Sequence, residues 1–143
     1  MSQFIIPVSR ITQDGICQIL GRINYRAEIV GDEEIRVYLN DCVVFVHVVQ
    51  ERGVIGISCM FVFCDDLADA TKSEKLTFLN TLNTELAFGR FYMDQGVVCY
   101  DYRLICDEGV MIHHLKTALD MFNYFVYSEL LHYGSLELIN LEG

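Results

Sequence analysis

Six cysteines, four histidines and twenty acidic residues are the side chains with which this chain of 143 residues could perform chemistry. A cysteine nucleophile needs an activating base and an orienting third group, so cysteine, histidine and aspartate together could form a catalytic triad. The sequence contains no nucleophile motif, phosphate-binding loop or dinucleotide-binding fingerprint that would bring such groups together. We therefore predict that the protein is not an enzyme and has no catalytic residues.

Five of the six cysteines lie in or beside predicted strands, where a thiol behaves as a small apolar side chain. The closest pair, Cys59 and Cys64, has an odd separation along one predicted strand, so the two side chains point to opposite faces of the sheet. The amino terminus lacks the basic start and the long apolar segment of a secretory signal. We therefore predict a cytoplasmic protein with reduced cysteines.

The histidines lack the spacing of a metal site. They are His47 in a predicted strand and His113, His114 and His132 in the predicted last helix. None of them has a second ligand at the i+4 spacing of a zinc-binding helix, so we predict no metal and no cofactor. A small thiol- or metal-dependent enzyme that uses Cys99, Cys106 and the histidines of the last helix is the alternative.

The segment Leu79–Leu86 is predicted to be helical, and the face that its leucines leave free carries uncharged asparagine and threonine. A solvated helix face normally carries lysine and glutamate, so this face is expected to meet another surface. Asn80 and Asn83 are three residues apart and lie on the same side of the helix. Two interpretations remain open: the amides brace the backbone of the neighbouring hairpin, or they contact another subunit.

Hydrophobic periodicity and turn signals predict the elements that position these side chains. Tight turns between consecutive strands require antiparallel pairing, so we expect an α+β fold with a single antiparallel sheet and the order α-βββ-α-ββ-α. In the predicted first helix, Gly15 and Gly21 each lower the stability of the helix by about 1 kcal/mol relative to alanine. The expected elements are a helix N-capped by Thr12, a short strand over Tyr25–Val30, a meander of Ile35–Leu39, Cys42–Gln50 and Val54–Cys64, a helix from the capping box Thr71–Glu74 to Leu86, strands Phe88–Met93 and Val97–Ile105, and a long helix from Glu108 to Tyr133.

The sequence contains more apolar residues than one buried face of a sheet can hold. The strands Cys42–Gln50 and Val54–Cys64 are apolar on both faces, so we expect helices to cover both sides of the sheet there. Between Val110 and Tyr133, fifteen of twenty-four residues are apolar or aromatic. Either this last helix is sunk deep into its own core, or part of it contacts a partner or a second subunit.

The formal net charge of −10 disfavours nucleic acid as a partner, because an acidic protein repels a polyphosphate backbone and the sequence has no compensating basic patch. The longest apolar stretches also fall short of the roughly 20 residues that a membrane helix requires. We therefore predict neither a nucleic acid nor a membrane partner. The chain length is typical of one domain, with about 100 to 150 residues around one core.

The run Leu79–Tyr102 resembles the signature region of the YbjN-domain family of bacterial sensory transduction regulators. The match rests on Asn80 and Asn83, on the segment Phe88–Tyr92, on the turn Asp94–Gly96, and on the tyrosines of the strand that follows, Tyr100 and Tyr102. The resemblance implies one YbjN-like domain over residues 1–143. It also implies a fold similar to class I type III secretion chaperones, which are small acidic proteins that commonly dimerise and hold client segments.

From these observations we expect a non-enzymatic protein-binding module, chaperone-like or a regulatory adaptor, which forms a homodimer and binds a protein partner or peptide segment. The alternative is a type III secretion chaperone that binds an effector segment. We expect the contacts with the partner or the second subunit to come from Asn80, Asn83, Arg90, Tyr92, Phe122 and Phe125.

Overall fold

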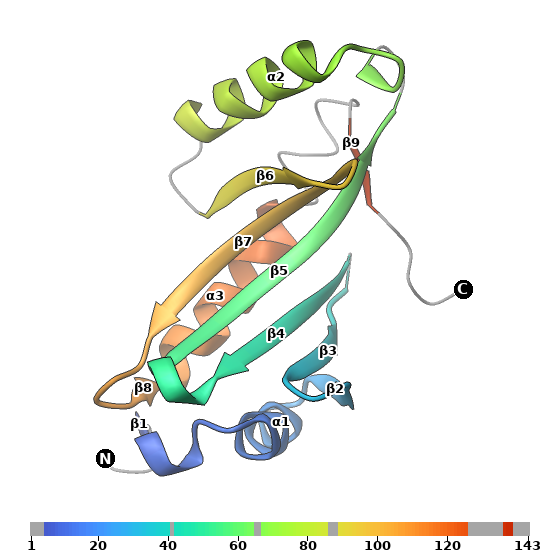
Figure 1. Ribbon diagram of the computed structural model, residues 1–143. Helices are drawn as coiled ribbons and strands as arrows, with labels where there is room; N and C mark the ends of the chain where they lie inside the picture. The colour runs from blue at the N-terminus through green and yellow to red at the C-terminus, as the bar shows by residue number, and fades with distance from the viewer. Residues whose placement is uncertain (1–4, 41, 65–66, 86–88, 126–135, 139–143) are drawn as a thin grey trace.

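A computed structural model describes residues 5–40, 42–64, 67–85, 89–125 and 136–138 of the chain. It contains three α-helices, two 3-10 turns and nine strands within these residues (Figure 1). The elements are β1 (Ile5–Ile6), the 3-10 turn Val8–Arg10, α1 (Gln13–Arg22), β2 (Arg26–Val30), β3 (Glu34–Tyr38), β4 (Val43–Val49), the 3-10 turn Gln50–Arg52, β5 (Val54–Phe63), α2 (Lys72–Glu85), β6 (Arg90–Asp94), β7 (Val97–Ile105), β8 (Val110–Met111), α3 (Ile112–Phe125) and β9 (Leu136–Leu138).

The main sheet has the strand order β2-β3-β4-β5-β7-β6, and β9 pairs with β5 beside this path. Each of its pairings is antiparallel, including the long pairing of β5 with β7. The predicted α+β class is therefore confirmed. The two β-hairpins β4–β5 and β6–β7 form as the turn signals predict, and they become neighbours in the sheet because β5 pairs with β7.

Two expectations about the architecture were wrong. The strands form two sheets rather than one, because β1 and β8 pair separately as a two-stranded sheet. The order α-βββ-α-ββ-α also fails: β1 precedes α1, β2 is a fourth strand of the meander, and β8 precedes α3. The last helix begins at Ile112 rather than at Glu108, because Gly109 has a φ of 102° and turns the chain into β8. Two-residue strands have no periodicity that a sequence pattern could reveal.

The predicted starts of α1 and α2 are confirmed in atomic detail. The Thr12 side chain accepts a hydrogen bond of 3.0 Å from the backbone N–H of Gly15 and caps α1. At the start of α2, the backbone N–H of Glu74 donates to Thr71 Oγ1 at 3.1 Å, and the backbone N–H of Thr71 donates to Glu74 Oε1 at 3.4 Å. These reciprocal bonds satisfy backbone donors that have no partner inside the helix.

One face of the main sheet packs against the helices and forms the core. Alternate residues of β3, β4, β5 and β7 are buried on this face, together with one apolar side of each of the three helices. In Figure 1, α3 lies behind β5 and β7, α1 lies below the meander, and α2 lies above β6. In the described part of the chain, no helix covers the face of the sheet that is turned toward the viewer in Figure 1.

The two glycines of α1 are predicted to respond in opposite ways to alanine. A Cβ at position 15 would overlap the backbone carbonyl oxygen of Arg10, whereas a Cβ at position 21 would meet no atom within 4 Å. We expect Gly15→Ala to lower the free energy of unfolding by about 1–2 kcal/mol, because a clash of about 1–3 kcal/mol outweighs the gain in helix propensity. We expect Gly21→Ala to raise it by about 0.5–1 kcal/mol. Urea denaturation measures both, and equal shifts in the two variants would contradict the prediction.

Candidate functional site

The face of the main sheet opposite the helices, here called the open face, carries a mixed set of apolar and charged side chains. One row of directly paired residues crosses the six strands of the sheet on this face, since partners that face each other across strands share a side. The row runs Glu28, Arg36, Phe45, Ser58, Asp101 and Arg90. Charged pairs therefore stand at both ends of the row, and an aromatic and a small residue stand in the middle.

A groove of about 490 Å³ lies over the middle of the open face. Its floor is at β5, where Gly56 has no side chain and Ser58 has a small one. Larger side chains from the neighbouring strands form its walls, including Phe45, Tyr92 and Arg103. The hollow thus exists because the central strand carries its smallest residues on the face that the helices leave uncovered.

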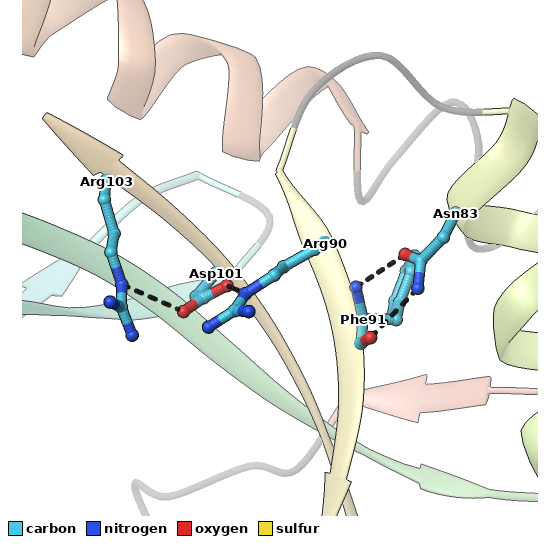
Figure 2. A network of polar contacts seen from close by, with 5 residues as sticks. All are labelled: Asn83, Arg90, Phe91, Asp101 and Arg103. Atoms are coloured by element: carbon cyan, nitrogen blue, oxygen red, sulfur yellow. Dashed lines mark hydrogen bonds and ion pairs between the residues drawn. The ribbon is translucent and has the colours of Figure 1, made fainter.

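Asp101 of β7 is the buried carboxylate at one end of the groove, with its side chain 9% exposed. Arg90 donates a hydrogen bond from Nε to Asp101 Oδ1 at 3.0 Å, and Arg103 Nε lies 3.5 Å from Asp101 Oδ2 (Figure 2). The hydrogen bond to Asp101 raises the pKa of Arg90, so its guanidinium stays charged. The guanidinium of Arg90 also lies over the ring of Tyr92, 5.4 Å from its centroid. Two cations thus share one buried anion at the edge of the groove.

Asn83 joins α2 to the outer edge of the sheet. Its Nδ2 donates to the carbonyl oxygen of Phe91 at 3.0 Å, and its Oδ1 accepts from the backbone N–H of Phe91 at 2.7 Å (Figure 2). The amide therefore bonds to the outward-facing backbone groups of β6 in the way that a neighbouring strand would. Of the two interpretations of the asparagine face, the intramolecular brace describes Asn83 in this structure, whereas Asn80 is exposed.

The remaining residues expected at a partner contact lie in different parts of the molecule. Tyr92 is 39% exposed and lines the groove next to Arg90. Phe122 is completely buried on the opposite side of the sheet, with its ring centroid 5.5 Å from that of Tyr100. The side chain of Phe125 lies outside the described part of the structure. Of the expected residues whose side chains the structure describes, only Arg90 and Tyr92 therefore lie together on the open face.

The helices of the described residues are all too short or too polar to cross a membrane. Within the same residues, no group of three or more histidine, cysteine or acidic side chains is arranged to hold a metal ion. His113 and His114 are exposed on α3, with ring centroids 6.3 Å apart.

Comparison with known proteins identifies the family to which this fold belongs. The family model of YbjN, described as "Putative bacterial sensory transduction regulator", matches residues 12–123, from the N-cap of α1 into the last turn of α3. The chain belongs to the YbjN family. A crystal structure of YbjN from E. coli, described as "a putative transcription regulator", superposes on this YbjN-family chain with a TM-score of 0.64 and 12% sequence identity. The match covers 89% of this chain and 95% of that chain, and at this identity it shows a shared fold.

No curated protein matches this YbjN-family chain significantly. The family membership confirms the resemblance drawn from the segment Leu79–Tyr102. The expected likeness to type III secretion chaperones and the expected homodimer stay predictions.

Three thiols of this YbjN-family protein, those of Cys59, Cys99 and Cys106, are poorly suited to nucleophilic catalysis. Burial raises the pKa of Cys99 and of Cys106, the two cysteines of the enzyme alternative, and it raises the pKa of Cys59 further. A reactive cysteine needs the opposite shift, because the thiolate is the nucleophile.

Several residues of the open face escaped the sequence analysis. Asp101 and Arg103 stand alone in an aromatic strand, so nothing local indicates that they pair with Arg90, which lies on another strand. A weak signal exists in β5, where Gly56 and Ser58 alternate with the larger Ile55 and Ile57. That alternation indicates one face with space above it. The expectation that helices cover both faces of this strand is not met by the helices of the described residues, which all lie away from this face.

Proposed function

We propose that this YbjN-family protein is a non-enzymatic protein-binding module, a regulatory adaptor that holds a segment of a partner protein in the groove of the open face. The observation that carries the proposal is the open face itself. Phe45, Met60 and Tyr92 present partly exposed apolar surface there, over central strands whose other face is fully buried. Exposed apolar surface that surrounds a hollow is typical of an interaction site.

The edge of β6 argues for docking through side chains on the face rather than for addition of a strand at that edge. An added strand would need the outward-facing backbone groups of β6. Asn83 already occupies both backbone groups of Phe91. A segment lying across the groove would instead meet the side chains of Phe45, Tyr92 and Arg103.

A groove-filling variant tests this proposal. A Cβ at position 56 would lie 3.9 Å from the nearest atoms, those of His47, and the backbone of Gly56 is outside the left-handed region. Gly56→Val is therefore expected to fill the floor of the groove while leaving the free energy of unfolding unchanged or raising it by about 0.5–1 kcal/mol. Partners captured from an extract of the native cells by the wild-type protein are expected to be lost by this variant.

Thr117→Val, on the exposed surface of α3, is the matched control because it introduces the same valine side chain far from the groove. Partners that bind Gly56→Val as tightly as the wild-type protein would contradict the proposal. The identity of a captured partner then decides between a regulatory adaptor and the narrower alternative of a chaperone for a secreted effector. Light scattering during gel filtration tests the expected homodimer separately, since a strict monomer at high concentration would exclude it.

A further inference from the structure

We propose that the open face recognises an acidic segment of the partner, and that one carboxylate of this segment binds between Arg90 and Arg103 above Asp101. This inference rests on the proposed function and adds the chemical class of the partner. It is carried by three observations: unused hydrogen-bond donors, an unbalanced positive charge, and the spacing of the residues around them.

The donors are the terminal nitrogen atoms of the two arginines. Arg90 and Arg103 each approach Asp101 with Nε, from opposite sides (Figure 2). Among the described residues, none accepts a hydrogen bond from the Nη atoms of either arginine. The two side chains are 60% and 62% exposed, so a ligand can reach these atoms from solvent. Guanidinium groups bind carboxylates with paired N–H donors, which gives both strength and orientation.

The charge balance favours a single carboxylate. Two guanidinium groups and one carboxylate leave a net charge of about +1 around Asp101, and the two further charged side chains that line the groove, Arg52 and Glu34, offset each other. Five of the seven arginines of the chain lie on or beside the open face: Arg26, Arg36, Arg52, Arg90 and Arg103. Four carboxylates, Glu28, Glu34, Asp94 and Asp101, lie on the same face, so its charge is about +1. Because the whole chain has a net charge of −10, an acidic segment is favoured at this face over the rest of the surface.

The strand register predicts what lies beside the carboxylate. Met60, Cys99 and Tyr92 are paired across β5, β7 and β6 one row further along the sheet on the same face as Asp101. Rows on one face are about 6.6–7 Å apart, which equals two residues of an extended chain. An extended segment that places an acidic residue over Asp101 therefore places the residue two positions away over an apolar surface. The predicted recognition pattern is an acidic residue separated by one residue from an aromatic or aliphatic one.

A library of displayed eight-residue peptides tests this inference. We expect selection on the wild-type protein to enrich peptides that carry aspartate or glutamate two positions from an aromatic or aliphatic residue. The enriched peptide is then labelled with a fluorophore, and its affinity is measured by anisotropy. Replacing its acidic residue by the corresponding amide is expected to weaken binding about fivefold, the upper range for an exposed ion pair.

The protein variants in this experiment are Arg90→Gln/Arg103→Gln and, as a control with the same change in net charge, Arg22→Gln/Lys116→Gln at exposed helix positions. We expect the first variant to bind the acidic peptide about fivefold more weakly and to make no distinction between it and its amide form. We expect the control to behave like the wild-type protein. The comparison of the two peptides on the wild-type protein needs no variant, so it holds even if the arginine variant fails to fold.

The outcomes separate this inference from the proposed function. Enriched peptides that are lost with Gly56→Val but show no preference for acidic residues would overturn the acidic segment and leave the protein-binding module standing. Peptides that bind regardless of Gly56→Val, or no enrichment at all, would overturn both. Binding of a single-stranded oligonucleotide that depends on Arg90 and Arg103 and exceeds that of the acidic peptide would overturn the acidic segment in favour of a nucleic acid.

Discussion

Phe122→Ala is expected to lower the free energy of unfolding by about 3–5 kcal/mol, which is a large part of the stability of a domain of this size. The side chain of Phe122 is completely buried in the core between α3 and the main sheet. Its ring meets the ring of Tyr100 in an edge-to-face arrangement at 5.5 Å, and Tyr100 in turn lies 4.6 Å from Phe91. Truncation would therefore leave a cavity and remove one member of an aromatic cluster that joins α3, β7 and β6.

Tyr124→Ala is the matched control, because this aromatic residue lies two positions further along α3 with 61% of its surface exposed. We expect it to change the free energy of unfolding by less than about 0.5 kcal/mol. Urea denaturation followed by circular dichroism measures both variants. A small effect of Phe122→Ala would contradict its place in the core and would reopen its expected role as a partner contact.

Asn83→Ala is expected to lower the free energy of unfolding by about 2–4 kcal/mol, because it removes two hydrogen bonds to partly buried backbone groups of Phe91 at once. The loss should be local at first, since Asn83 links α2 to β6 at the edge of the sheet. Hydrogen exchange followed by mass spectrometry should therefore show a larger increase in exchange rate, relative to the wild-type protein, in β6 than in β4. Asn83→Asp keeps the acceptor for the Phe91 N–H but faces the Phe91 carbonyl with a carboxylate oxygen, so it should not restore the wild-type stability.

Asn80→Ala provides the comparison within the same helix face. Asn80 is exposed, and we expect its replacement to change the free energy of unfolding by less than about 0.5 kcal/mol. Equal losses of unfolding free energy in Asn80→Ala and Asn83→Ala would contradict the proposed role of Asn83 in bracing β6. A stability unaffected by Asn80→Ala together with weaker binding of a partner would instead support the contact that the sequence predicts for Asn80.

The long elements of the fold could be predicted because they carry their own signals. The capping residues of α1 and α2 lie within three positions of the donors that they satisfy, so Thr12 and Thr71–Glu74 could be identified without any tertiary information. The alternation in the meander and the turn between β6 and β7 are equally local. The short strands β1 and β8 have no such signal. They form only because Gly109 turns the chain and brings residues 110–111 beside residues 5–6.

The two glycines of α1 show where local reasoning stops. Both count as weak helix formers in the sequence, and nothing local distinguishes them. In the structure, Gly15 admits the carbonyl oxygen of Arg10, whereas Gly21 faces open space. The difference comes from the path of the chain before the helix, which no propensity describes.

By itself, the sequence determined the α+β class, the positions of α1, α2 and the long strands, the acidic charge and the family, because each of these depends on residue types and on neighbours a few positions apart. Only the tertiary structure decided which side chains meet. Asp101 lies between Arg90 and Arg103 because β6 pairs with β7, and Ser58 lies beside this cluster because β5 pairs with β7. The groove and its charges thus arise from pairings between distant segments, and strand register sets those contacts across the sheet rather than along the chain.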